Sequence, residues 1–158
     1  MNPFDLSNKV ICVTGASSGI GRQCAVSCSR MGATVVLLAR NEQRLHETLS
    51  IMDNPDKHVI IPVDLTEYAT VELVVKNIVS QVGRISGVLH CAGISTTLPL
   101  KLVTPEKLDE FFQANVFSAY NLTREVCKMG NFSKEGGSIV FFSSVMGKVG
   151  ENGKSLYG

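Results

Sequence analysis

A glycine-rich turn near the N-terminus carries the clearest chemical signal in the sequence. Residues 14–21 read T-G-A-S-S-G-I-G and directly follow an apolar segment. Where a strand passes into a helix, one glycine permits a tight turn, a second lets the backbone approach a pyrophosphate, and a third lets helix and strand pack closely. The candidate cofactor-binding residues of this turn are Gly15, Ser17, Ser18, Gly19, Ile20 and Gly21.

The same turn favours a dinucleotide over a nucleoside triphosphate. The first N–H groups of the helix that follows, and the partial positive charge there, attract phosphate. The spacing departs from G-x-G-x-x-G, and the triphosphate pattern G-x-x-x-x-G-K-[ST] with its lysine is absent. A phosphotransfer protein is therefore disfavoured, and a purely structural Gly/Ser turn is the remaining alternative.

Arg40 stands at the end of the second apolar segment, about 20 residues beyond the glycines, where NAD-binding sites carry an acidic residue for the ribose 2′-hydroxyl. A guanidinium at this position instead suits a 2′-phosphate, whose oxygens it can bind in a bidentate manner. The sequence therefore predicts NADP(H) as the cofactor. The alternative is a solvated arginine that opens a surface helix beside Glu42 and Arg44.

The elements that must position these residues alternate regularly along the chain. Continuous apolar runs predict strands buried on both faces, at 9–14, 34–39, 58–63, 87–91 and 138–142. Helical spacing predicts helices at 19–31, 41–52, 68–82 and 105–129, the last broken near Asn115 and begun by the Thr104 N-cap before Pro105. We expect an α/β fold: a single domain over residues 1–158 with a Rossmann-type, doubly wound parallel sheet in three layers, α/β/α.

Composition and charge narrow the classes of partner. The 158 residues carry a formal net charge of +1, so neither nucleic acid nor an anionic membrane is expected as a partner. Residues 1–9 show no signal peptide, and the apolar runs are far shorter than the ~20 residues that span a bilayer. We expect a cytoplasmic protein. The five cysteines match no zinc or redox spacing and are expected to be small buried apolar residues; no metal site is predicted.

The spacing T-G-x-x-x-G-x-G resembles the classical short-chain dehydrogenase/reductase family, and the resemblance extends over the whole chain. It is most similar to the group that includes 3-oxoacyl-carrier-protein reductases. The resemblance implies that Asp64 and Leu65 contact the adenine, and that Ala92 and Gly93 leave room for the cofactor. Cys91 stands where the family usually has asparagine, which removes an amide that ties neighbouring segments together. Helix capping is the alternative role for Asp64.

The resemblance also assigns the catalytic residues. Asn115 matches the family's helix asparagine, although an ordinary polar helix residue is the alternative. Ser144 and Tyr157 match the catalytic serine and tyrosine, at the family's spacing. The implied reaction interconverts a small-molecule carbonyl and a secondary alcohol, with hydride exchanged at the nicotinamide. Tyr157 would act as the acid/base, and Ser144 would hydrogen-bond the same substrate oxygen.

The family's lysine, four residues after the tyrosine, has no counterpart because Gly158 is the last residue. We therefore expect a C-terminally truncated relative with weak or no activity, Tyr157 on a frayed end, and strand 138–142 as an exposed edge. The alternative is a non-catalytic dinucleotide-binding sensor or interaction module. The resemblance implies a homo-oligomer for full-length relatives and leaves the oligomeric state of this chain open. Many NADP-preferring relatives carry a second basic residue at the position of Ser18. Because this chain has serine there, the prediction of NADP(H) rests on Arg40 alone.

Overall fold

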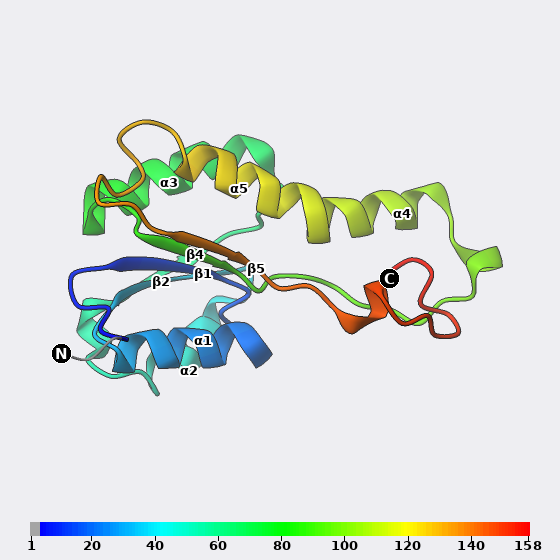
Figure 1. Cartoon of the computed structure of the whole chain (residues 1–158), viewed down its shortest axis with the longest axis horizontal. Coiled ribbons are helices and arrows are strands. Elements are labelled where there is room, and N and C mark those ends of the chain that lie inside the picture. Colours follow the sequence, from blue (N-terminus) through cyan, green and yellow to red (C-terminus); the bar gives the residue numbers. More distant parts are fainter. Residues whose placement is uncertain (1–3) are drawn as a thin grey trace.

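The computed structural model describes residues 4–158 and has a three-layer α/β architecture (Figure 1). Over these residues the strands are β1 (Val10–Thr14), β2 (Thr34–Ala39), β3 (Val59–Pro62), β4 (Gly87–His90) and β5 (Ser138–Phe141). They form one sheet in the order β3-β2-β1-β4-β5, and each neighbouring pair is parallel. The predicted doubly wound parallel sheet is confirmed.

Strand β1 lies at the centre of the sheet. Every residue of β1 is buried, because β1 pairs with β2 and β4 in the plane of the sheet and its side chains pack into a core on each face. The chain first builds outward from β1 through β2 to β3, and then returns to β4 and β5 on the other side. The order of strands therefore reverses between β1 and β4, which is the position where α/β sheets of this kind bind ligands.

Helices cover both faces of the sheet (Figure 1). Helices α1 (Gly19–Arg30) and α2 (Glu42–Leu49) lie on one face, and α3 (Tyr68–Val82) and α5 (Ser118–Val126) lie on the other. Helix α4 (Pro105–Phe112) is on the same side as α5 but extends beyond the ends of the strands. Successive β1 side chains alternate between the two cores, as the pleat of a strand requires. Val10 and Cys12 pack with the core that contains α3 and α5, whereas Ile11 and Val13 pack with the core beneath α1 and α2.

The predicted break in the long helix is confirmed and has a defined form. Residues Gln113–Phe117, between α4 and α5, form a π-helical turn that contains Asn115. Such turns are rare and are frequent at functional sites. The start of α4 also agrees with its prediction, because the hydroxyl of Thr104 accepts a hydrogen bond from Lys107 N–H at 3.3 Å.

Most element boundaries lie within one residue of the prediction, and the exceptions are the ends of α2 at Leu49 and of the long helix at Val126. Helix α2 is shorter than predicted at both ends. Asn41 is its N-cap and accepts a hydrogen bond from Arg44 N–H, and Ser50 follows its last residue. Strand β4 ends at His90, because the backbone of Cys91 turns back and its N–H donates to Leu89.

Beyond β5 the chain leaves the sheet and runs past the loop before α4 (Figure 1). Among residues 4–158, β5 pairs only with β4, and Phe141 and Phe142 are 57% and 46% exposed. The predicted exposed edge is confirmed for these residues. In the part of the chain that the structure describes, none of the helices combines the length and apolarity needed to cross a membrane.

Candidate cofactor-binding site

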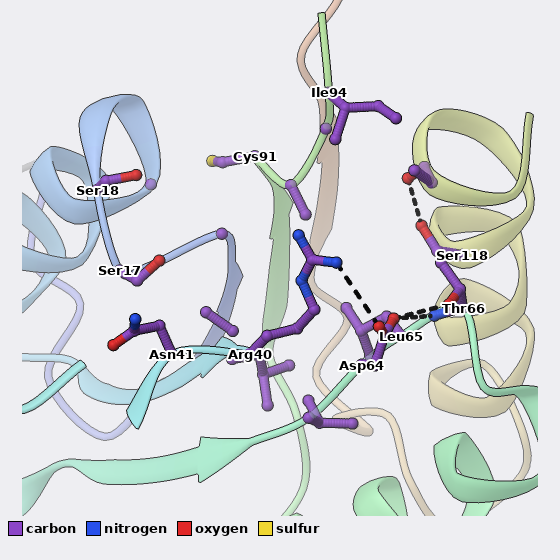
Figure 2. Close-up of a pocket in the computed structure, with 18 of the residues that line it drawn as sticks. Ser17, Ser18, Arg40, Asn41, Asp64, Leu65, Thr66, Cys91, Ile94 and Ser118 are labelled. Atoms are coloured by element: carbon purple, nitrogen blue, oxygen red, sulfur yellow. Dashed lines mark hydrogen bonds and ion pairs between the residues drawn. The ribbon is translucent and has the colours of Figure 1, made fainter. Parts of the chain in front are cut away.

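A cleft of about 980 Å³ opens at the carboxyl ends of β1, β2 and β4, at the point where the strand order reverses. Its walls come from the glycine-rich turn, the end of β2, the loop after β3 and the loop after β4 (Figure 2). Every residue predicted to bind the cofactor lines it: Gly15, Ser17, Ser18, Gly19, Ile20, Gly21, Arg40, Asp64, Leu65, Ala92 and Gly93.

Two glycines of the turn occupy positions that no other residue fits. Gly15 has φ +65°, and a Cβ there would lie 2.9 Å from the backbone of Ala92. A Cβ on Gly21 would lie 2.3 Å from the carbonyl oxygen of Gly15, so the turn packs directly on α1. Ser18 precedes α1 without making a side-chain capping bond. The first N–H groups of a helix lack partners within it, so those of α1 are available to an anion.

The loop after β4 is held to the rest of the cleft by two side chains. The hydroxyl of Thr14 accepts a hydrogen bond from Ala92 N–H at 3.0 Å. The amide of Asn115 makes a pair of bonds with the backbone of Ile94: it accepts from the N–H at 2.7 Å and donates to the carbonyl at 2.9 Å. Asn115, in the π-helical turn, therefore holds the backbone of this loop in place. An ordinary polar residue on a helix surface, the alternative considered for Asn115, would not make this pair of bonds.

Cys91 adapts to its position by packing rather than by hydrogen-bonding the neighbouring segments. Its side chain is half-buried against the core beneath α1 and α2, on the cleft wall seen in Figure 2. Burial, together with the neighbouring thiols Cys24 and Cys28, raises the pKa of Cys91 to about 12. The thiol is therefore protonated at neutral pH and behaves as a small apolar group.

The prediction that the cysteines are buried is confirmed for two of the five. Cys12 and Cys28 are buried, Cys24 and Cys91 are half-buried, and Cys127 is exposed. Among residues 4–158, no group of three histidine, cysteine or acidic side chains is arranged to hold a metal ion.

Arg40 and Asp64 face each other across the rim of the cleft (Figure 2). Arg40 Nη1 lies 3.8 Å from Asp64 Oδ2, and the arginine side chain is 74% exposed. Asp64 also accepts hydrogen bonds from Thr66, from its N–H at 3.0 Å and its hydroxyl at 2.7 Å. Partial burial alone would raise the pKa of Asp64, but these bonds and the charge of Arg40 lower it below its usual value.

The helix-capping role considered for Asp64 is wrong. Helix α3 begins at Tyr68, and the residue before it is Glu67, which makes no side-chain capping bond. Asp64 instead closes a tight turn through Thr66, four positions before the first residue of the helix. Its carboxylate therefore stays at the cleft, bonded to Thr66 and close to Arg40.

Ser144 and Tyr157 do not line the cleft. The hydroxyl of Ser144 accepts a hydrogen bond from Met146 N–H at 3.2 Å and opens a short 3₁₀ turn, Val145–Gly147. Tyr157 is half-buried in a turn in which its N–H donates to Lys154 at 2.9 Å. The expected frayed end is instead a hydrogen-bonded turn.

The C-terminal turn is also attached to the loop after β4. Lys154 Nζ donates to the carbonyl of Thr96 at 3.1 Å and lies 5.9 Å from the centre of the Tyr157 ring. The N–H of Leu98 donates to Gly153 at 2.7 Å. A lysine thus stands beside the tyrosine ring, three residues before it in the chain.

Sequence reasoning missed residues that support the cleft from behind. Thr48 on α2 is completely buried, and its hydroxyl contacts the carbonyl of Ala16 in the glycine-rich turn. Arg22 on α1 donates a hydrogen bond to the carbonyl of Ser17, also in the glycine-rich turn. A threonine within a polar helix gives no periodic signal, and the link between α1 and α2 exists only in three dimensions.

The fold and the position of the cleft are those of a Rossmann-type α/β domain, and comparison with known proteins identifies the family. The short chain dehydrogenase family profile matches residues 9–158. The chain is 32% identical over 158 residues to the uncharacterized oxidoreductase YciK of Escherichia coli K12, covering 96% of this chain and 62% of YciK. It is 30% identical over 161 residues to 3-dehydrosphinganine reductase of Danio rerio, covering 98% of this chain and 48% of that protein.

Solved structures show the same relationship. A short chain dehydrogenase from Shigella flexneri, complexed with NADP, superposes with a TM-score of 0.86 at 33% identity, over 96% of this chain and 65% of that one. A counterpart from Escherichia coli CFT073, complexed with NADPH, also gives 0.86 at 33% identity, over 98% of this chain and 66% of that one. This chain belongs to the short-chain dehydrogenase/reductase family. It spans about half to two-thirds of the length of these relatives.

Proposed function

We propose that this protein is an NADP(H)-dependent oxidoreductase that interconverts a carbonyl and a secondary alcohol. The observation that carries the proposal is the pairing, in one cleft, of a glycine-rich turn at a helix N-terminus with the guanidinium of Arg40 at the end of β2. The turn suits a pyrophosphate and the guanidinium suits a 2′-phosphate. The relatives that carry NADP or NADPH in their structures support the same cofactor.

The residues of this chain would hold the cofactor along the cleft. The N–H groups at the start of α1 bind the pyrophosphate, and Arg40 turns from Asp64 to the 2′-phosphate. Asp64 and Leu65 border the adenine, while Ala92 and Gly93 let the cofactor pass close to the backbone. Bound NADPH would supply the hydride.

The proton chemistry is assigned to Ser144 and Tyr157. Tyr157 donates a proton to the substrate oxygen as negative charge develops on it, and Ser144 hydrogen-bonds the same oxygen. Asn115 keeps the loop after β4 in place beside the nicotinamide end of the cleft. In this structure Ser144 and Tyr157 stand outside the cleft lining, so productive chemistry requires the segment after β5 to place them at its mouth.

A 3-oxo compound is the substrate class we favour. The resemblance to 3-oxoacyl-carrier-protein reductases and the similarity to a 3-dehydrosphinganine reductase both favour a substrate whose ketone is on carbon 3 of the chain. The relative named L-xylulose reductase, 34% identical over 145 residues, makes a ketose the second class to test. Helices α4 and α5 expose Leu108, Phe112 and Tyr120, which would suit an oligomer interface in the complete protein.

The decisive assay follows NADPH oxidation with 3-oxoacyl thioesters, 3-oxo long-chain amines and ketoses. A polypeptide that includes the lysine expected four residues after Tyr157 should reduce at least one class, and Tyr157→Phe should abolish turnover without weakening NADPH binding. For residues 1–158 alone we expect cofactor binding with weak turnover. NADPH binding combined with no turnover in the longer polypeptide would instead favour the non-catalytic sensor or interaction module.

A further inference from the structure

We propose that Thr48 and Arg22 are positioning residues that orient the backbone of the glycine-rich turn for the cofactor pyrophosphate. The inference rests on the proposed function, because it concerns how the same cleft binds its phosphates. Neither side chain is assigned to the cofactor itself. Both act on the turn from its far side, through the carbonyl oxygens of Ala16 and Ser17.

The contacts form a continuous chain from α2 through α1 to the turn. Thr48 Oγ1 lies 2.9 Å from the carbonyl oxygen of Ala16 and accepts a hydrogen bond from Arg22 Nε at 3.0 Å. Its single proton is shared between Ala16 and the carbonyl of Arg44, 3.0 Å away on the same helix. Arg22 Nη2 donates to the carbonyl of Ser17 at 2.7 Å.

Fixing these two carbonyls also fixes two N–H groups. In a planar trans peptide the C=O and the N–H point in opposite directions. The carbonyl of Ala16 shares its peptide unit with the N–H of Ser17, and the carbonyl of Ser17 shares its unit with the N–H of Ser18. Because both carbonyls are held toward Arg22 and Thr48, both N–H groups are turned to the opposite side, where Ser17 and Ser18 line the cleft.

A turn held in this way does not need to reorganise when it binds phosphate, and such preorganisation improves affinity. Charge-assisted donors such as a guanidinium make the stronger hydrogen bonds. Helix α2 also begins directly after Arg40, with Asn41 as its N-cap. The helix that carries Thr48 therefore links the pyrophosphate end of the cleft to the residue proposed to recognise the 2′-phosphate.

The ion pair between Arg22 and Glu47 provides a matched control. Arg22 Nη2 lies 3.2 Å from Glu47 Oε2, and the glutamate side chain is 52% exposed. Exposed pairs of this kind contribute little to stability. Glu47→Gln should therefore leave the turn, and its affinity for phosphate, unchanged.

Calorimetry with three ligands tests the proposal. NADPH and ADP carry a diphosphate at the 5′-position of the adenosine, and adenosine 2′-monophosphate does not. We expect Thr48→Val and Arg22→Gln each to weaken NADPH and ADP about tenfold, the equivalent of one lost hydrogen bond. Binding of adenosine 2′-monophosphate should stay within about twofold of the wild type. Thr48→Ser, which keeps the hydroxyl, should restore the affinity for ADP.

Folded variants that bind ADP with wild-type affinity would overturn the proposal. An equal loss of affinity for all three ligands would also overturn it, because it would indicate a merely structural role. If Thr48→Val does not fold, Arg22→Gln and Thr48→Ser decide the outcome. A wild-type protein that binds ADP but not NADPH would contradict the proposed function. The positioning role would then be decided by comparing the affinity of the wild type and the variants for ADP.

Discussion

Arg40 and Asp64 form an ion pair across the rim of the cleft, with 3.8 Å between Nη1 and Oδ2. The pair is loose, and Asp64 is already bonded to both the N–H and the hydroxyl of Thr66. Asp64 therefore keeps its position when the arginine leaves, and the exposed guanidinium of Arg40 is free to exchange a carboxylate for a phosphate. If the proposed function is correct, Arg40 is the residue on which cofactor preference depends.

Replacing Arg40 should change cofactor preference without destroying the site. Arg40→Ala removes a charge-assisted contact with the 2′-phosphate and should weaken NADPH about 10- to 100-fold. NADH, which lacks that phosphate, should change by less than about threefold. Binding isotherms for both cofactors check this, and Arg30→Ala, at the exposed end of α1, is the control. Equal losses for both cofactors would contradict the assigned role.

Adding a methyl group at Gly21 should destabilise the fold. Its Cβ would lie 2.3 Å from the carbonyl oxygen of Gly15, so the turn and α1 must separate. We expect Gly21→Ala to lower the free energy of unfolding by roughly 1–3 kcal/mol, as measured by urea denaturation. Gly150→Ala meets nothing within 4 Å and should unfold like the wild type. A stable Gly21→Ala protein with intact NADPH binding would show that the contact is not required.

Asn115 should stabilise the loop after β4 through its paired bonds with Ile94. Asn115→Ala leaves the N–H and carbonyl of Ile94 without these partners and should cost roughly 1–3 kcal/mol. Hydrogen exchange at Ile94 N–H should accelerate in step. Asn77→Ala, on the exposed face of α3, is the control and should leave Ile94 protected. Unchanged exchange at Ile94 in the Asn115 variant would contradict this role.

The imidazole of His90 should make stability fall in mild acid. His90 is buried, its ring stacks on Phe141 with 4.6 Å between centroids, and Nε2 lies 2.9 Å from Thr123 Oγ1. Burial lowers its pKa from the usual 6.5 to about 4. Between these two pH values the unfolded state binds the proton more readily, so stability is complete above about pH 6.5 and decreases as the pH falls toward 4.

At pH 5 the loss from His90 is on the order of 2 kcal/mol relative to pH 7. Urea unfolding at the two pH values should therefore show a smaller difference for His90→Asn than for the wild type. His46→Asn, at an exposed position of α2, should retain the wild-type difference. Identical pH dependence in wild type and His90→Asn would show that the imidazole is not held neutral by the fold.

The fold was predictable because its signals are local. Continuous apolar runs identified β1 and β2, helical spacing gave α3 its exact bounds, and Thr104 with Pro105 marked the start of α4. The cofactor cleft was predictable for a related reason. In a parallel sheet all carboxyl ends lie at one edge, so residues that follow successive strands must meet there.

What the sequence did not reveal depends on contacts between distant segments. Nothing in the pattern around Thr48 indicates that its hydroxyl meets Ala16, 32 residues earlier in the chain. The pairing of Arg40 with Asp64 likewise requires β2 and β3 to be neighbours. The position of Ser144 and Tyr157 could not be read from their spacing, because it depends on how the segment after β5 folds.

The most direct test of the central claim is a pair of calorimetric titrations of the folded protein, one with NADPH and one with NADH. The glycine-rich turn and Arg40 together predict that NADPH binds, and that it binds at least about tenfold more tightly than NADH, which one charge-assisted contact with the 2′-phosphate provides. Absence of binding to either dinucleotide, or an equal or higher affinity for NADH, would contradict the account.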